Sequence, residues 1–483
     1  MLNEGLGLHT VAHDTHVDRT PELQKLANGG ELTNETTNAD AEFKSDNSNS
    51  KEVSQAREDV EQAYQDDTPD GGLRAWLVIV GVNFASALRS TSFNLTAFAK
   101  AASGTFATFG YVNTFGVFQS YYEETVMPTT SPSTISWIGS AQYALIFVPG
   151  LLTGRLYDKG HVKLPLAVAS ALLVTSTFLT AECTEYWQFL LCQGILAGLT
   201  CGVIFGPSVG VTAHWFKRKR GIALGVISGG SSIGGTVFPI AARHLIQDVG
   251  FKWTMRILGF IQLFALSITC LTVARRLPPS KAPKKLVDFT IFKSLAYTIY
   301  CVANLVSFLG LYTVLTYIDV SAVHAGLDPN FTYYLVAIAN VSSGFGRITA
   351  GFIADRTGPL NILIPGTTIA AVLTYAWPFA KTTGDFVAIA IIYGLFSAVY
   401  VSLLPAPIMA MGNQHNVGIM VGVSMTILAA GAISGPPISG AINASTGGFK
   451  SVGYYAGSMI LASVALLIVT RQTVLKGRIY GRA

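Results

Sequence analysis

Residues 154–160 of the chain read GRLYDKG, and the same pattern returns as GFIADRTG in residues 351–358. Each copy lies between two long apolar segments, so the two halves of the chain share one layout. A duplicated bundle of membrane helices, whose halves rock against each other around a central site, is the architecture of many secondary transporters. The repeat therefore predicts an all-α membrane protein built from two related halves.

The composition agrees with this prediction. Of the 483 residues, 50% are hydrophobic and 12% are charged, and the mean hydropathy is +0.46. These values suit a helical membrane protein and no soluble class. The sequence shows no catalytic triad, nucleotide motif or clustered metal ligands, and its five cysteines are scattered mostly through apolar runs. We therefore expect no enzymatic activity, no metal or other cofactor and no nucleic-acid partner.

The first 70 residues differ from the rest of the chain. They hold 16 acidic and 5 basic residues and few large apolar side chains. Such a segment cannot bury enough apolar surface to fold, so we predict a disordered acidic cytoplasmic tail over residues 1–70. The segment contains no apolar core of a signal peptide, and the first membrane helix is expected to act as the insertion signal.

Long apolar runs predict twelve membrane helices, since about 20 mainly apolar residues cross a bilayer. The first helix lies within 73–121, and the other eleven lie near 135–155, 162–181, 187–213, 221–242, 253–273, 291–318, 331–353, 360–379, 385–411, 417–441 and 453–470. The predicted domains are an N-terminal six-helix bundle over 71–273, a cytoplasmic linker over 274–290, a C-terminal six-helix bundle over 291–472 and a cytoplasmic tail over 473–483.

Basic residues predict the orientation, because positive loops stay in the cytoplasm. If the acidic tail is inside, one inner loop holds four consecutive basic residues at 217–220 and another holds five between 275 and 285. The outer loops 122–134, 182–186 and 319–330 contain no Lys or Arg. Both termini are therefore predicted to be cytoplasmic.

The first helix does not fit this scheme. The stretch from Leu73 to Tyr122 is too long for one span, and Arg89 and Lys100 interrupt it. Removing roughly 82–104 leaves one helix of suitable length. We interpret 82–104 as an insertion from a retained intron or an incorrect gene model, and a broken helix is the alternative.

The two copies of the opening motif lie between helices 2 and 3 and between helices 8 and 9. This GxxxD(R/K)xG pattern resembles the signature of the major facilitator superfamily. Each aspartate is expected to cap a helix N-terminus or to pair with a base, and so to hold a cytoplasmic gate. The gating residues are Gly154, Asp158, Lys159, Gly351, Asp355 and Arg356.

Two further stretches resemble the fungal branch of the monocarboxylate-porter family. Residues 70–76 read DGGLRAW before helix 1, and residues 214–225 read HWFKRKRGIALG at the start of helix 5. The residues that carry the resemblance are Asp70, Gly71, Gly72, Trp76, Lys217, Arg218 and Gly225. Members of this branch carry different cargoes, so the resemblance indicates a family without indicating a substrate.

Arg347 is the ionisable residue that lies clearly inside a predicted span. It precedes Asp355 by eight residues, which places it about 12 Å along helix 8 from the inner boundary. A charge at this depth costs about 2.5 to over 10 kcal/mol unless it faces a polar cavity or a partner. Arg347 either reaches back to the cytoplasm or to backbone carbonyls, or it binds a carboxylate on the cargo. The family resemblance favours the second role.

The sequence also departs from the well-studied animal members of that family. Their helix 1 lysine and helix 8 acid correspond to Asn113 and Ser343, and no Asp or Glu is predicted in the membrane interior. The missing proton-binding pair weakens the case for proton-coupled transport of lactate-like cargo. Polar side chains that offer hydrogen bonds instead include Gln142, Asn304 and Tyr312. We therefore predict a larger, more neutral or aromatic cargo.

The leading hypothesis is a secondary active transporter that moves a small organic acid or secondary metabolite by alternating access. Efflux is slightly favoured, and a co-transported proton stays open. The alternatives are a nutrient uptake permease for a monocarboxylate or vitamin-like cargo, and a non-transporting membrane sensor with a transporter fold. We expect a monomeric multi-pass protein of the plasma membrane, whose partners are the lipid bilayer and a small-molecule cargo.

The predicted topology can be tested with glycosylation. Asn330 and Asn443 begin sequons in predicted outer loops, whereas Asn34 begins one in the inner tail. Glycosidase treatment should increase the gel mobility of the wild-type protein and leave an Asn330→Gln variant less affected. A mobility shift that depends on Asn34 would show that the predicted orientation is inverted.

Overall fold

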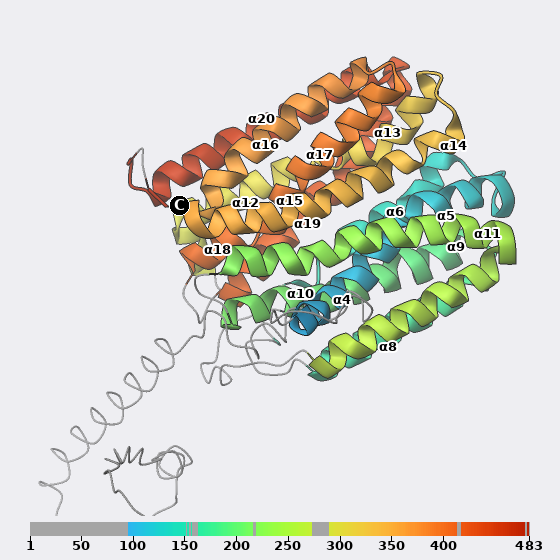
Figure 1. Cartoon of the computed structure of the whole chain (residues 1–483), viewed down its shortest axis with the longest axis horizontal. Coiled ribbons are helices and arrows are strands. Elements are labelled where there is room, and N and C mark those ends of the chain that lie inside the picture. The colour runs from blue at the N-terminus through green and yellow to red at the C-terminus, as the bar shows by residue number, and fades with distance from the viewer. Residues whose placement is uncertain are drawn as a thin grey trace, which may run out of the picture. The chain divides into compact units, whose positions relative to one another are not determined.

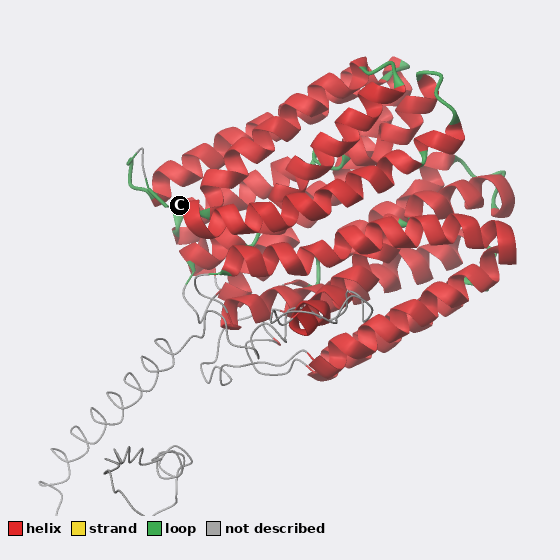
Figure 2. Cartoon of the chain, in the orientation of Figure 1, coloured by secondary structure: helices red, strands yellow, loops and turns green. Residues whose placement is uncertain are grey.

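The computed structural model describes residues 95–150, 152–153, 156, 163–215, 219–272, 289–412, 417–478 and 481–482. The predicted tail over 1–70, most of the linker over 274–290 and residues 82–94 lie outside the described residues. All regular elements within the described ranges are helices (Figure 2). The prediction of an all-α fold is therefore confirmed.

The helices of the N-terminal half are separated by short connections. They are α4 (Leu95–Asn113), α5 (Phe115–Tyr121), α6 (Pro132–Leu145), α8 (Lys163–Thr180), α9 (Tyr186–Phe189), α10 (Ala197–Trp215) and α11 (Arg220–Thr272), with π-helical turns at Tyr122–Val126 and Leu190–Leu196. The second π-helical stretch joins α9 to α10, so this pair corresponds to predicted helix 4.

The C-terminal half is built in the same way. Its α-helices are α12 (Leu295–Phe308), α13 (Thr313–His324), α14 (Pro329–Thr332), α15 (Tyr334–Thr357), α16 (Pro359–Ala376), α17 (Thr383–Leu403), α18 (Ala406–Met411), α19 (Val417–Thr446) and α20 (Phe449–Val474). Figure 1 shows the blue-to-green helices gathered on one side and the yellow-to-red helices on the other.

Glycines mark the sharpest breaks between helices. Gly250 has a φ of 79° and divides α11 into the two helices predicted at 221–242 and 253–273. Gly358, the last residue of the second motif copy, has a φ of 101°, and Pro359 follows it at the first position of α16. A left-handed φ of this kind favours glycine, and proline suits the first turn of a helix.

Eight helical segments of the described chain are long and apolar enough to cross a membrane. They account for nine predicted spans, because the segment Arg220–Leu271 contains two of them. The other three predicted spans correspond to α4 with α5, to α6 and to α15, which lie outside this set. The helices are those of a multi-pass membrane protein, and the count of twelve stays a prediction.

The suspected insertion is described only in part. α4 begins at Leu95 and includes its last ten residues. Within that part, the Ser103 and Thr269 hydroxyls lie 2.6 Å apart. A turn at Thr114 then separates α4 from α5. The interpretation of 82–104 as an insertion stays a prediction, and a transcript read across this region tests it.

Small residues allow the helices to pack backbone against backbone. A Cβ atom added to Gly202 of α10 would lie 2.4 Å from the Ile146 carbonyl oxygen, and one on Gly198 would lie 2.7 Å from the Gln142 carbonyl oxygen. Both distances are shorter than a van der Waals contact. The glycine face of helix 4 is therefore in direct contact with the backbone of helix 2, as small faces in membrane bundles usually are.

One ion-pair cluster ties the segment after α8 to α11. The Glu182 carboxylate accepts hydrogen bonds from Lys252 Nζ at 2.7 Å and from Arg256 Nη2 at 2.9 Å. These two bonds, the Lys252 bond first, hold the pKa of Glu182 below its usual range. The Glu182 side chain is half exposed, so solvent screens the pair.

We predict that Glu182→Gln slightly lowers the Tm of the purified protein at neutral pH and leaves it unchanged in acid. Because the folded-state pKa is depressed, the stabilisation is present above the unfolded carboxyl pKa of about 4.3 and is lost as the pH falls through the folded value. Thermal unfolding of both proteins across this range measures the difference. The exposed Glu124→Gln is the control, and an equal Tm at neutral pH would contradict the prediction.

Candidate functional site

The second copy of the motif holds the two halves together at one end of the bundle. We call this end, which the sequence predicts to be cytoplasmic, the inner end, and the opposite end the outer end. Asp355 of α15 accepts hydrogen bonds from the backbone N–H groups of Gly221 at 2.6 Å and Ile222 at 3.0 Å, at the N-terminus of α11. A carboxylate at this position pairs with free N–H groups and with the positive end of the helix dipole. Asp355 is therefore a helix cap that acts between the halves.

Glycines bring the two backbones together beside this cap. A Cβ on Gly221 would lie 2.4 Å from the Gly351 carbonyl oxygen, and one on Gly351 would lie 2.3 Å from the Gly221 carbonyl oxygen. One turn further along, a Cβ on Gly225 would lie 2.4 Å from the Arg347 carbonyl oxygen. The Arg220 guanidinium adds a hydrogen bond to the Met409 carbonyl at 3.1 Å. The inner ends of the two halves are therefore in tight contact.

The contact between α11 and α15 continues toward the outer side. The hydroxyls of Ser232 and Ser343 lie 2.7 Å apart, and Asn340 Nδ2 donates to the Gly235 carbonyl at 3.1 Å. Near the outer end, the Arg243 guanidinium lies 4.3 Å from the centre of the Tyr333 ring. We call this series of contacts the α11–α15 seam.

The other contact between the halves, formed by α19 and the chain from α6 onward, is shorter. A Cβ on Gly150 would lie 3.3 Å from the Gly422 carbonyl oxygen, and Thr426 Oγ1 donates to the Val148 carbonyl at 3.2 Å. Further out, Ser140 of α6 and Pro436 of α19 line an internal cavity. α6 and α19 therefore meet beside the cavity and both contribute to its wall.

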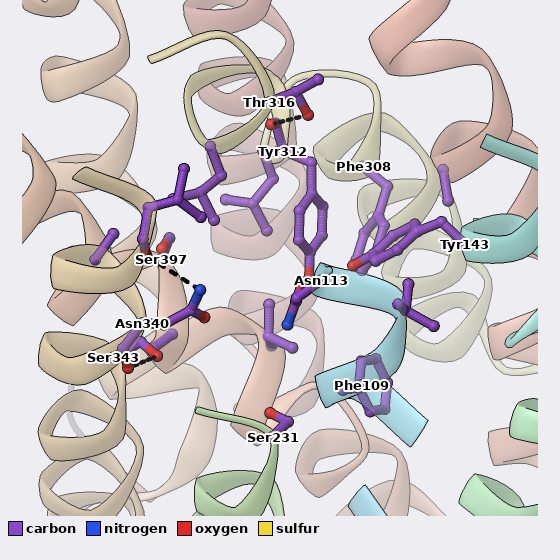
Figure 3. Close-up of a pocket in the computed structure, with 18 of the residues that line it drawn as sticks. Phe109, Asn113, Tyr143, Ser231, Phe308, Tyr312, Thr316, Asn340, Ser343 and Ser397 are labelled. Atoms are coloured by element: carbon purple, nitrogen blue, oxygen red, sulfur yellow. Dashed lines mark hydrogen bonds between the residues drawn. The ribbon is translucent and has the colours of Figure 1, made fainter. Parts of the chain in front are cut away.

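The cavity between the halves has a volume of about 310 Å³, which is in the range of small-molecule sites. Its wall is mostly aromatic, aliphatic and hydroxyl-bearing. Residues that line it include Phe109, Asn113, Ser140, Tyr143, Phe147, Ser231, Phe308, Tyr312, Asp319, Asn340, Ser343, Arg347 and Ser397. Figure 3 shows Tyr312, Tyr143, Asn113 and Asn340 pointing into the same space from different helices.

Aromatic side chains form one side of this space. The Tyr143 and Tyr312 ring centroids are 4.7 Å apart at an interplanar angle of 62°, and those of Phe147 and Phe308 are 5.5 Å apart at 82°. Both pairs have the edge-to-face geometry that aromatic rings prefer. Because Tyr143 and Phe147 come from the N-terminal half and the other two from the C-terminal half, the wall is shared between the halves.

Two amides face each other across a glycine. A Cβ on Gly235 of α11 would lie 2.7 Å from Asn113 Nδ2 and 2.9 Å from Asn340 Oδ1. The lack of a side chain at this position therefore leaves room for both amides at the cavity wall. Together they offer hydrogen-bond donors and acceptors to a bound molecule.

Arg347 forms hydrogen bonds to α11 through one of its nitrogens. Its Nη1 donates to the Ser228 carbonyl at 2.8 Å and to Ser231 Oγ at 2.5 Å. Its Nε is buried and has no hydrogen-bond partner among the described residues. The side chain is half-buried and lines the cavity.

The cavity brings together four of the six residues predicted to bind substrate, Arg347, Asn113, Ser343 and Tyr312. The other two do not line it. Gln142 is buried, and neither polar atom of its side chain has a described partner. Asn304 is buried within the C-terminal half, where it forms hydrogen bonds with Ser424 at 3.1 Å and with Tyr400 at 2.7 Å.

Several other predicted residues lie outside the described residues. These are Gly154, Asp158 and Lys159 of the first motif copy, and Asp70, Gly71, Gly72, Trp76, Lys217 and Arg218 of the family signatures. In the second copy, the Arg356 guanidinium lies 4.0 Å from the centre of the Phe352 ring. Asn330 belongs to the short helix α14 and Asn443 to the last turn of α19, where a loop was predicted.

Several cavity residues were missed from the sequence, among them Tyr143, Phe308 and Asp319. Helix 7 was predicted to end near residue 318, but α13 continues to His324, so Asp319 is helical and lines the cavity. The absence of acidic residues from the membrane interior stays a prediction. The apolar run stops at Asp319, but the helical repeat of apolar residues continues through Val320 and Val323 and gave a signal for the longer helix.

Comparisons with known proteins agree with this description. The sequence profile of the Major Facilitator Superfamily matches residues 82–406 and 300–481. The MFS transporter asaE of Aspergillus flavus is 36% identical and covers 84% of this chain and 88% of its own length. The aspyridones efflux protein apdF of Emericella nidulans is 35% identical, over 81% of this chain and 77% of its own length.

A third relative, the agnestins efflux protein AgnL12 of Paecilomyces divaricatus, is 32% identical over 77% of this chain and 86% of its own length. Among solved structures, the human organic anion transporter MFSD10 matches with a TM-score of 0.61 and 14% identity, over 82% of this chain and 99% of that one. The Escherichia coli fucose:proton symporter matches with a TM-score of 0.57 and 16% identity, over 77% and 98%. These two structures share the fold.

We predict that Asp355→Ala opens the inner end of the α11–α15 seam. The substitution leaves the N–H groups of Gly221 and Ile222 without their acceptor, and the loss of such a cap costs about 0.5–2 kcal/mol. A cysteine at position 224, introduced after the five native cysteines are replaced, reports the change. Its labelling by an impermeant maleimide from the cytoplasmic side should become several-fold faster.

Asp355→Asn is the graded control, because its amide keeps one acceptor oxygen but loses the charge. Its labelling rate should lie between those of the parent and Asp355→Ala. Equal rates in all three proteins would show that the cap does not hold the inner end closed.

Proposed function

The chain belongs to the major facilitator superfamily, and from this premise we propose that it is a secondary active exporter of a small organic acid or secondary metabolite, working by alternating access. Two of the fungal relatives carry the word efflux in their names, which supports export. We further propose that it belongs to the fungal branch of the monocarboxylate porters and acts as a monomer in the plasma membrane.

The observation that carries the proposal is a cavity between the halves with a guanidinium on its wall and a closed inner end. Arg347 lines the cavity, and Asp355 caps α11 on the inner side. A site between two halves, closed on one side, is what alternating access requires. The arrangement supports a transporter in its cytoplasm-closed state.

The wall also supports a class of cargo. Arginine binds carboxylates through charge-assisted hydrogen bonds, often through two nitrogens at once. The Tyr143 and Tyr312 rings offer faces and edges for an apolar or aromatic body, and the Asn113 and Asn340 amides offer hydrogen bonds. We therefore propose a cargo with an acidic group and an unsaturated or aromatic body, larger than lactate.

An untargeted metabolite comparison tests the export proposal. Cells with and without the gene are grown in separate cultures. Metabolites are then measured inside the cells and in their media. Export predicts that at least one organic acid accumulates inside and falls outside when the gene is deleted. The opposite pattern would identify an uptake permease, and unchanged metabolites would overturn transport of an endogenous product.

We predict that Arg347→Lys reduces cargo flux per surface copy roughly 10- to 100-fold. Lysine keeps the charge but loses the planar pair of donors, and a lost charge-assisted hydrogen bond costs about 1.5–3 kcal/mol. Flux is measured with the metabolite that the comparison identifies, after normalisation to surface protein.

Arg256→Lys is the matched control, since Arg256 pairs with Glu182 outside the cavity and its flux should stay normal. Near-normal flux in Arg347→Lys would overturn the carboxylate contact. Arg347 would then have a structural role that any long basic side chain can fill.

A further inference from the structure

We propose that Asp319 is the cavity residue that binds and releases the proton exchanged for cargo. The proposal rests on the function proposed above and adds a coupling group to it. It also answers the question raised by Asn113 and Ser343, which stand where animal relatives carry their proton-binding pair.

The position of Asp319 favours this role. It lies on α13, is half-buried and lines the same cavity as Arg347. Its Oδ1 accepts the Val320 N–H at 2.7 Å, and no ion pair is formed between Asp319 and any described basic side chain. The carboxylate therefore stands on the wall without a fixed counter-charge.

The chemistry of the described wall residues also points to Asp319. Their charged side chains are those of Asp319 and Arg347. The guanidinium keeps its proton at every physiological pH, and tyrosine hydroxyls ionise only near pH 10. A carboxyl group is the member of this wall whose charge changes between an acidic medium and a neutral cytoplasm.

The titratable groups on α13 are engaged elsewhere. The Tyr317 hydroxyl donates to the Pro436 carbonyl at 2.9 Å. The His324 ring packs edge-on against Phe449, with centroids 5.9 Å apart. Neither side chain forms a described bond with Asp319, so neither competes for its proton.

The helices packed against α13 are α14, α15, α17, α19 and α20. Asp328 precedes α14, and α15 carries Arg347. Tyr333 precedes α15, and its ring packs against the Arg243 guanidinium. On α17, the Tyr393 hydroxyl donates to a backbone carbonyl. The sequence of α19 contains no charged residue.

Lys450 of α20 lies 5.7 Å from the centre of the Phe379 ring, and Glu123 accepts a hydrogen bond from Gln119 of α5 at 2.8 Å. Gln119 lines the cavity, whereas Glu123 and Lys450 are not among its wall residues. Asp319 is thus the carboxyl group that the wall presents to a bound molecule.

The proton balance is simple. With the inner end closed, the Asp319 carboxylate takes a proton from hydronium in the outer solution and becomes a neutral carboxyl group. After the cavity opens inward, the carboxyl group gives the proton to water. No other bond forms or breaks.

The charge of the cargo decides the direction of coupling. Export in exchange for a proton requires that the two compete, and a hydroxyl or amine on the cargo competes by donating a hydrogen bond to the ionised carboxylate. A plain anion would instead bind better when Asp319 is protonated, which couples the two in the same direction. The proposal therefore assigns the exported cargo a hydrogen-bond donor besides its acidic group.

The experiment needs no cargo. The full chain is reconstituted in lipid, and the infrared carboxyl stretching band is titrated in the wild type, in Asp319→Asn and in the exposed control Asp248→Asn. Over the pH range in which the protein stays folded, we expect one titrating band to be lost in Asp319→Asn and kept in Asp248→Asn. Asp319→Glu should keep a titrating band at a shifted frequency.

A second readout links the proton to the motion. Ser140→Cys on the cavity wall, after replacement of the native cysteines, is labelled from the outside at different pH values. Because a cysteine reacts as its thiolate, each rate is divided by that of an exposed reference cysteine at the same pH. This ratio should change several-fold with pH when Asp319 is present and stay constant with Asp319→Asn.

An Asp319→Asn spectrum that keeps every titrating band in this pH range would overturn the proposal, and so would unchanged pH dependence of labelling. The two proposals fail separately. Unchanged metabolites with a titrating Asp319 would refute only export, whereas continued export without a titrating Asp319 would refute only the coupling role.

Discussion

The close backbone contact between α11 and α15 is the constraint on which the rest of the site depends. Glycines at 221, 225 and 351 leave no side chain between the two helices, so carbonyl oxygens and Cα atoms lie at contact distance. Because the halves meet this closely, Asp355 reaches the N-terminus of α11 and Arg347 reaches Ser228. A single β-carbon in the series would move both groups away from their partners.

Smooth contacts of this kind hold two surfaces together without locking them. Interdigitated large side chains resist sliding, whereas glycine and serine faces present little relief, and a few polar bonds determine the register. The α11–α15 seam follows this pattern from Gly221 to Gly235, with bonds that can exchange for water when the halves part. α6 and α19 also pack against each other, and residues of both helices line the cavity beside this seam.

The sequence predicted the features that depend on local pattern. The repeated motif and the apolar runs indicated a duplicated helical bundle, and the isolated charge at Arg347 indicated a polar cavity at that depth. Asp355 was expected to cap a helix or to pair with a base, but the choice between these roles and the identity of the capped helix depend on contacts between the halves, which no local pattern encodes.

The failures have a common physical cause. Gln142, Asn304 and Tyr312 are similar polar residues on apolar helices, and only the rotation of each helix decides whether a side chain faces the cavity or the interior of a half. Tyr312 lines the cavity, whereas Asn304 is satisfied by Ser424 and Tyr400. Asp319 was missed because a charge in the last turns of an apolar run looks like the end of the membrane span.

In the proposed function, Arg347 joins cargo binding to the motion of the halves. Its side chain belongs to α15, yet its bonded nitrogen Nη1 donates to Ser228 and Ser231 of α11, so the guanidinium is part of the seam as well as of the cavity wall. A carboxylate that draws the guanidinium into the cavity competes with these bonds, and the seam then loses two polar contacts at its centre. Anion binding thereby weakens the contact that must loosen before the inner end opens. The site and the gate are then coupled directly, through Arg347.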